Sequence, residues 1–132
     1  MGRHQKIVSF DFDDTLCWES DGTPNDKMLA VVRQHAADGH KCYIVTARHR
    51  SHESSKWIKE NEPDRVRIKD FIKEHDLPIK QCHFTAHELK GPILRQIGAY
   101  RHYDDQPEQL RSARENGIEA IQVRREEKNG NS

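Results

Sequence analysis

The chain has 132 residues, which fits one domain with one core, and its 22 basic and 22 acidic side chains leave no net charge. This balance argues against nonspecific binding along nucleic acid and favours a small or terminal substrate. Three widely spaced cysteines predict reduced thiols in a cytoplasmic protein, and the short apolar runs predict neither a membrane span nor a signal peptide.

The first predicted element is a short strand at Ile7–Phe10, which runs directly into a group of acidic residues. Asp11 and Asp13 therefore follow the carboxyl end of a strand, and this is the edge where open parallel sheets bind ligands. Two carboxylates near one point repel each other, and a hard divalent cation with oxygen ligands, most simply Mg²⁺, would neutralise them. The alternative is an acidic turn in which residues 13–15 cap the next helix.

The second predicted strand, at residues 42–45, also ends in polar side chains. A helix is predicted before this strand: the Pro-Asn-Asp sequence at residues 24–26 indicates the helix start, and the helix runs to about Asp38. Thr46 and Arg48 come directly after the strand, and a hydroxyl together with a planar guanidinium suits phosphate oxygens. A helix cap for Thr46 and a surface charge for Arg48 remain the alternatives.

Residues 50–80 carry helical signals and no strand signal. Two helices are predicted at 53–60 and 64–75, with Pro63 between them. This interval fits either a small accessory lobe over the site or a lengthened helical crossover on the surface. It is too short for an independent cap domain with its own core.

The carboxyl-terminal half repeats the alternation of strand and helix. Lys90 lies between a weak third strand at 82–84 and a short helix, where it could supply a compact cation for a phosphate. This short helix is predicted at 93–97, and a fourth strand at 100–103 runs into Asp104 and Asp105. A helix then begins at about residue 107 and ends at Gly117, and a fifth strand is predicted at 118–123. Residues 124–132 are predicted to be a disordered tail.

This order predicts an α/β fold, a three-layer doubly wound parallel sheet of about five strands with right-handed crossovers. A single domain is expected over residues 1–123, without a large cap domain. Strands one, two and four each end in a polar group, and parallel strands bring these ends to one edge of the sheet. The sequence carries no signal for an oligomeric state.

Four segments, in this order, resemble the motifs of phosphatases of the haloacid dehalogenase superfamily. They are FDFDDTL, IVTAR, the lysine of ELKGPIL, and HYDDQ. The TAR, YDDQPEQL and GIEAIQV segments are further similar to the phosphatase half of phage polynucleotide kinases. The resemblance implies a Rossmann-like fold and a cytoplasmic, Mg²⁺-dependent phosphomonoester hydrolase, encoded by a cell or a phage, that acts through an aspartyl phosphate. Its substrates would be nucleotides or phosphorylated nucleic-acid ends.

The resemblance also implies a role for each matched residue. Asp11 would be the nucleophile, and Asp13 the general acid and base. Thr46, Arg48 and Lys90 would hold the substrate phosphate. Magnesium would be bound by Asp11, Asp105 and the backbone carbonyl of Asp13, with Asp104 in support. The residues themselves further predict that Thr15 forms a hydrogen bond within the turn and holds Asp13.

The sequence also fits functions other than the hydrolysis of nucleotides or nucleic-acid ends. The enzyme could act on small phosphate esters instead, or the chain could be a catalytically silent scaffold that binds a protein partner through residues 50–80. A phosphoacceptor signalling domain would need an acceptor Asp after the third strand, where this chain has Phe84 and Thr85.

A zinc site is the alternative reading of four histidines. His49 and His52, and His83 and His87, have the spacing of metal ligands. With nine histidines in the chain such pairs arise easily, so solvated surface side chains are the favoured interpretation.

Overall fold

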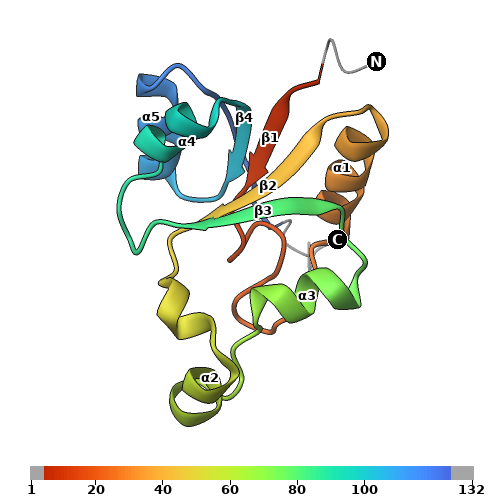
Figure 1. Cartoon of the computed structure of the whole chain (residues 1–132), viewed down its shortest axis with the longest axis vertical. Coiled ribbons are helices and arrows are strands. Elements are labelled where there is room, and N and C mark those ends of the chain that lie inside the picture. The colour runs from red at the N-terminus through yellow and green to blue at the C-terminus, as the bar shows by residue number, and fades with distance from the viewer. Residues whose placement is uncertain (1–4, 126–132) are drawn as a thin grey trace, which may run out of the picture.

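The computed structural model describes residues 5–125, in which one sheet lies between two layers of helices (Figure 1). The strands are β1 (Ile7–Phe10), β2 (Lys41–Thr46), β3 (Ile79–Phe84), β4 (Ala99–Asp104) and β5 (Glu119–Gln122). The helices are α1 (Asp26–Ala37), the 3₁₀ helix η1 (Arg50–Glu53), α2 (Ser55–Asn61), α3 (Ile68–Glu74), α4 (Gly91–Ile97) and α5 (Pro107–Glu115).

The sheet has five parallel strands in the order β3-β2-β1-β4-β5, which confirms the predicted α/β fold. The chain first winds outward from β1 through β2 to β3 and then returns to the other side of β1 for β4 and β5. The winding direction therefore reverses at β1. Ligands of open α/β sheets bind at such a switch point, and here the carboxyl ends of β1, β2 and β4 are neighbours.

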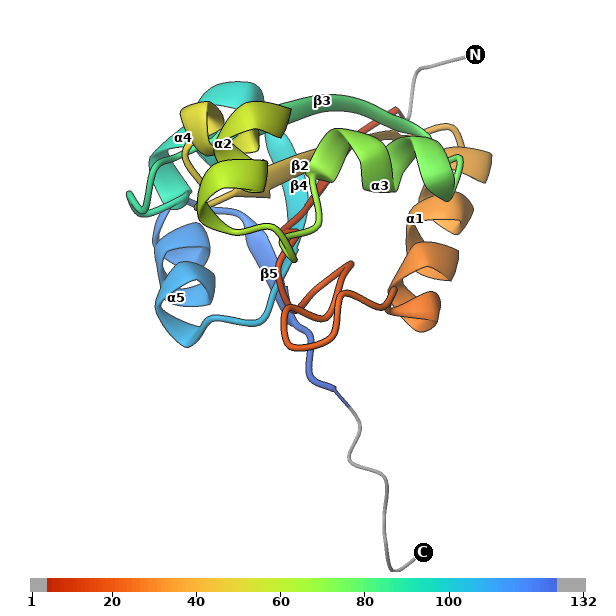
Figure 2. The same ribbon diagram turned by 90° about the horizontal axis from the view of Figure 1, so that it is seen from below.

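Helices lie on both faces of the sheet (Figure 2), and an apolar core lies on each face. On one face, Phe10 and Ile44 pack with residues of α1 and α3, among them Leu29. On the other face, Val45 packs with Leu94 of α4 and with residues of α5. Adjacent residues of β2 thus point to opposite cores, as the pleat of a strand requires, and burial on both faces explains the nearly continuous apolar run of this strand.

The loop after β1 is tied to the start of α1 by Asn25. The Asn25 side chain accepts a hydrogen bond from the backbone N–H of Met28 at 3.3 Å, which caps the helix. Its amide donates to the backbone oxygen of Thr15 at 2.9 Å, and its backbone N–H donates to the oxygen of Leu16 at 2.8 Å. The capping residue therefore also fixes the loop that carries the first acidic group.

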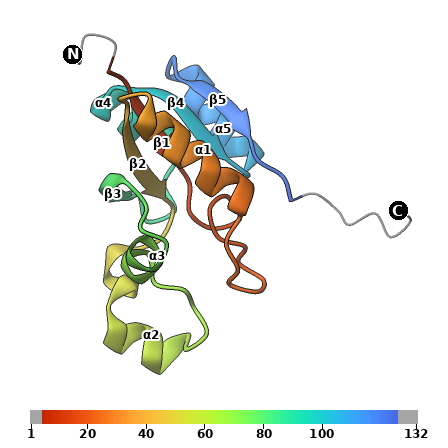
Figure 3. The same ribbon diagram turned by 90° about the vertical axis from the view of Figure 1, so that its right-hand side faces the viewer.

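The segment between β2 and β3 departs most from the predicted boundaries. The helix expected at 53–60 is split into η1 and α2, because Ser54 is extended and caps α2 by accepting from the N–H of Trp57 at 3.1 Å. The helix expected from residue 64 begins at Ile68, after an extended Arg67. Helix α2 lies beyond the end of β2, away from the sheet (Figure 3). Strand β3 begins three residues earlier than predicted, since an edge strand tolerates exposed polar residues.

At the carboxyl end, Arg125 contacts the body of the protein. Its guanidinium lies 3.0 Å from the carboxylate of Asp21 and 4.8 Å from the ring centre of Trp18. The rest of the predicted disordered tail, residues 126–132, lies outside the described residues.

Cys17, Cys42 and Cys82 are all free thiols. Among residues 5–125, the helices are too short and too polar for any of them to cross a membrane.

Candidate active site

Asp11 follows β1 directly, in a buried position, 5% exposed, at the carboxyl edge of the sheet. The chain then turns tightly, because the backbone N–H groups of residues 15–17 all donate to the oxygen of Phe12. The ring of Phe12 points into the core, where it meets Phe71 edge to face at 5.0 Å. The hydroxyl of Thr15 donates to the Asp11 carboxylate at 3.4 Å, whereas the sequence predicts a contact that holds Asp13.

Lys90 joins Asp11 to the end of β4. Its ammonium nitrogen lies 2.9 Å from Oδ1 of Asp11 and 2.6 Å from Oδ2 of Asp104, and the side chain is 1% exposed. Its backbone N–H donates to Oε1 of Gln109 at 2.8 Å, which holds the residue at the start of α4. Burial favours a neutral lysine, but the charges of Asp11 and Asp104 outweigh it and raise the pKa of Lys90. The side chain is therefore a fixed cation.

Asp104 is held by a buried chain of polar groups that the sequence did not reveal. Nε2 of His102 lies 2.8 Å from Oδ2 of Asp104, and Nδ1 of His102 lies 2.8 Å from the hydroxyl of Ser9. Burial opposes ionisation, yet the hydrogen bond from His102 and the charge of Lys90 lower the pKa of Asp104. The sequence feature that could have indicated this chain is a polar residue within each of two predicted strands, Ser9 in the first and His102 in the fourth.

Three carboxylates meet at this point and form the acidic cluster of Asp11, Asp104 and Asp105. One oxygen of each lies within 4.8 Å of the others. Burial, with the charge of Asp104 adding to it, raises the pKa of Asp105 to about 6 and raises that of Asp11 as well, although Lys90 opposes the shift at Asp11. Among the described residues, Oδ1 of Asp105 is buried without a hydrogen-bond partner. Three carboxylates, two of which share Lys90, fit a divalent cation with oxygen ligands, such as Mg²⁺.

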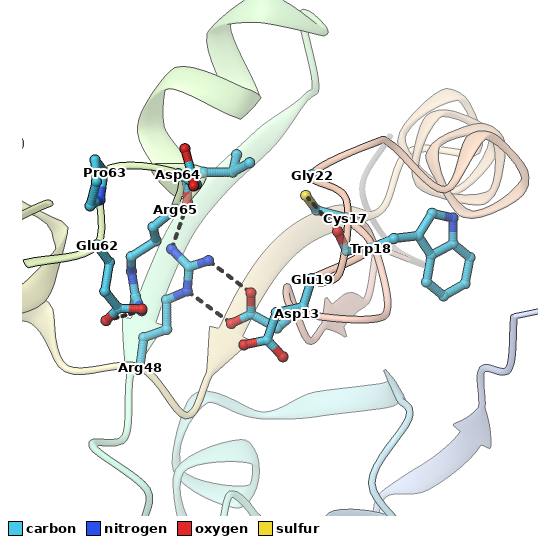
Figure 4. A pocket seen from close by; sticks show the side chains of 11 residues that line it. Asp13, Cys17, Trp18, Glu19, Gly22, Arg48, Glu62, Pro63, Asp64 and Arg65 are labelled. Atoms are coloured by element: carbon cyan, nitrogen blue, oxygen red, sulfur yellow. Dashed lines mark hydrogen bonds and ion pairs between the residues drawn. The ribbon is translucent and has the colours of Figure 1, made fainter. Parts of the chain in front are cut away.

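The side chain of Asp13 points toward Arg48 (Figure 4). Nε and Nη2 of Arg48 donate to the two Asp13 oxygens at 2.8 and 2.7 Å, while Nη1 donates to Glu53 and to the backbone oxygen of Val66, both at 2.8 Å. Arg48 is 7% exposed, so it is not a surface charge. The hydroxyl of Thr46 accepts from the backbone N–H of Arg48 at 3.2 Å and so helps to shape this turn.

Glu53 is a second residue that sequence reasoning missed. Besides Arg48, its carboxylate accepts from Arg65 at 3.3 Å and from the backbone N–H of Ile68 at 3.0 Å, and its backbone oxygen accepts from Arg67 at 2.7 Å. Glu53 thereby fastens the segment between β2 and α3 to the residues beside Asp13. No local pattern marks it, because all but one of its partners come from residues 65–68.

The acidic cluster opens into a hollow of about 580 Å³, which we call the acidic hollow. Asp11, Asp13, Lys90 and Asp105 all line it, and its carboxylates outnumber its basic side chains. An anionic substrate would be repelled here unless a cation were also bound, which again fits a metal site. Arg48 and Asp13 also line a neighbouring hollow, the one that Figure 4 shows.

The four histidines of the alternative zinc site are not gathered around one point. His83 lies on β3, with Nε2 2.9 Å from Gln81 and its ring beside Tyr43. Within residues 5–125, the acidic cluster is the group in which three metal-binding side chains converge. His49, His52 and His87 lie together, but ring against ring.

Comparison with known proteins identifies similar folds. No protein-family model matches the chain, and no curated protein matches it. A chain in a structure of the Pnkp1/Rnl/Hen1 complex superposes with a TM-score of 0.67 at 14% identity, covering 93% of this chain and 47% of that one. A chain in a structure of the Pnkp1/Rnl/Hen1 RNA repair complex gives 0.68 at 13% identity, covering 91% and 42%. At these identities the similarity shows the fold alone, and this chain spans less than half of each neighbour.

Proposed function

We propose that the protein is a Mg²⁺-dependent phosphomonoester hydrolase that acts on nucleotides or phosphorylated nucleic-acid ends. The observation that carries this proposal is the position of Asp11, a buried carboxylate at the switch point of the sheet, 2.9 Å from Lys90 and within an acidic cluster suited to a cation. The resemblance of the four motifs to haloacid dehalogenase phosphatases supports it, as does the likeness of the fold to chains of an RNA repair complex.

In the first step, a carboxylate oxygen of Asp11 attacks phosphorus, and the bond between phosphorus and the ester oxygen breaks. The departing oxygen takes a proton from the Asp13 carboxyl group, so an alcohol leaves. Lys90, fixed between Asp11 and Asp104, would hold the phosphoryl group in line with the nucleophile. Mg²⁺, held by Asp11, Asp105 and the backbone carbonyl of Asp13, would neutralise negative charge on the phosphoryl oxygens.

In the second step, water attacks phosphorus and gives its proton to the Asp13 carboxylate. The bond between phosphorus and the Asp11 oxygen breaks, which releases inorganic phosphate and restores both carboxyl groups. Both Asp13 oxygens accept a hydrogen bond from the guanidinium of Arg48, and each keeps a further lone pair that can accept a proton. We infer that, when the substrate is bound, part of the Arg48 guanidinium turns from Asp13 to the substrate phosphate. The hydroxyl of Thr46 would bind the same phosphate.

The test is a phosphatase screen with Mg²⁺ over mononucleotides, sugar phosphates, and oligonucleotides with a 3′ or 5′ phosphate. We expect release of inorganic phosphate from nucleotides or oligonucleotide ends. Turnover of a sugar phosphate alone would indicate an enzyme of small phosphate esters, and no turnover at all would indicate a silent scaffold.

The Asp11→Asn variant tests the nucleophile in the same screen. It should stay folded and lose activity by about a thousandfold or more, because the shape is kept and the nucleophile is removed. Asp70→Asn is the control, because Asp70 is exposed on α3 and does not line the acidic hollow. Its activity should remain near that of the wild type. A rate for Asp11→Asn within about tenfold of the wild-type rate would contradict the proposed role.

A further inference from the structure

Four aromatic rings line the acidic hollow and touch one another in a row. His87 lies 5.0 Å from His49, His49 lies 4.8 Å from His52, and His52 is stacked on Trp57 at 4.0 Å with an angle of 9° between the ring planes. We call these four residues the aromatic strip. The hollow that contains the proposed nucleophile is therefore lined by aromatic rings as well as by carboxylates.

The strip is assembled from two separate parts of the chain. His49, His52 and Trp57 come from the segment that runs from the end of β2 into α2, whereas His87 comes from the loop after β3. The backbone N–H groups of Ala86 and His87 donate to the oxygens of Arg48 and Ala47 at 3.1 and 2.7 Å. These bonds fasten the second loop to the residues beside the phosphate site.

The loop after β3 is held in an unfavourable backbone conformation. Ala86 and His87 have φ values of 52° and 69°, a region that residues other than glycine rarely adopt. Two such residues in succession persist only where their surroundings hold them, and these conformations concentrate at functional sites. Here the conformation brings the ring of His87 against that of His49.

The strip is not part of the apolar core. Neither core cluster of the described residues includes any of its members, and none of the four side chains is fully buried. Arg65 adds a guanidinium 5.7 Å from the ring centre of Trp57. Partly exposed aromatic rings beside a cation, next to a phosphate site, make a surface on which flat heterocycles stack.

We propose that the aromatic strip binds the nucleobase of the substrate by stacking while the phosphate lies at Asp11, an inference that rests on the proposed function. A volume of about 580 Å³ falls within the range of small-molecule sites and can take both groups at once. Every base has a flat face, so stacking selects nucleotides over sugar phosphates without selecting one base.

The first test compares a nucleoside monophosphate with the matching sugar phosphate that lacks a base. The quantity measured is the ratio of their kcat/KM values. Trp57→Ala should lower this ratio about tenfold, mainly through KM for the nucleotide, and His52→Ala should lower it in the same direction. Lys59→Ala, exposed on the same helix, is the control and should leave the ratio unchanged. An unchanged ratio in both strip variants would overturn the proposal.

The second test needs no turnover. The chain has two tryptophans, so Trp18→Phe leaves Trp57 as the sole indole, and adding Asp11→Asn prevents hydrolysis. A phosphorylated dinucleotide should quench Trp57 fluorescence, whereas ribose phosphate should not. If the dinucleotide quenches Trp57 fluorescence but the wild-type protein hydrolyses no substrate of the screen, base stacking on the aromatic strip is supported and the phosphatase activity is refuted. Nucleotide hydrolysis without quenching would refute the strip and leave the phosphatase standing.

Discussion

The guanidinium of Arg48 binds both carboxylate oxygens of Asp13, with Nε 2.8 Å from Oδ2 and Nη2 2.7 Å from Oδ1. Burial alone would lower the pKa of Arg48, but the hydrogen bond and charge of Asp13 raise it, so the guanidinium remains a cation. The same planar fork fits two oxygens of a phosphate. Under the proposed function, Asp13 occupies donors that a substrate phosphate would need, so the two anions would compete for Arg48.

Arg48→Lys keeps the positive charge of this side chain and removes the planar guanidinium, which can donate two parallel hydrogen bonds. We expect kcat/KM to fall by an amount that corresponds to about 1.5 to 3 kcal/mol of transition-state stabilisation, the range for a charge-assisted hydrogen bond. Steady-state kinetics on the best substrate of the screen measures this loss. Arg95→Lys, exposed on α4, is the control. Wild-type kinetics for Arg48→Ala would show that this residue does not bind phosphate.

Magnesium should bind the acidic cluster and raise the melting temperature, since a ligand that binds the folded state stabilises it. Asp105→Asn should weaken the affinity for Mg²⁺ roughly tenfold or more, because it removes one anionic ligand of the cluster. The measurements are melting temperature against Mg²⁺ concentration and turnover in chelator. Asp70→Asn, exposed on α3, should behave like the wild type. Full turnover in chelator would rule out the metal.

The sheet and the acidic edge were predictable because their signals are local. Short apolar strands alternate with helices, and each of three strands runs directly into polar residues, so the parallel topology brings Asp11 and Asp104 together, and Lys90 reaches both from the start of α4. These contacts depend on where the strands end, which the sequence marks. They do not depend on the conformation of any long loop.

The surroundings of Arg48 were not predictable in the same way. Asp13 lies 35 residues before it and Val66 lies 18 residues after it, and only the folded chain brings them together. The start of α3 was misplaced for a related reason: Glu53 binds the backbone N–H of Ile68, so the helix begins at a tertiary contact and not at the acidic residues before it.

Gly91 is a position where a single methyl group should disturb both the packing and the site. A Cβ there would be driven into Ser112 and Asn116 of the neighbouring α5 region, and α4 could not keep its place. We expect Gly91→Ala to lower the free energy of unfolding by about 1 to 3 kcal/mol and to reduce activity by displacing Lys90. Urea denaturation measures the first effect. Gln96→Ala, exposed on the same helix, should be close to neutral, and wild-type stability for Gly91→Ala would refute the tight contact.

Substrate length should matter little beyond a few nucleotides. The segment between β2 and β3 forms η1, α2 and α3 and no separate core, so the acidic hollow stays open to a bulky end. Two of its cations, Arg48 and Lys90, are already engaged by carboxylates, which leaves little positive charge to hold phosphates farther along a strand. We therefore expect similar kcat/KM for a short and a long oligonucleotide with the same phosphorylated end, and a shallow salt dependence, with a log-log slope of about −1 to −2. Kinetics on a length series at several salt concentrations provides the measurement. An affinity that rises steeply with length and falls steeply with salt would reveal an extended nucleic-acid surface instead.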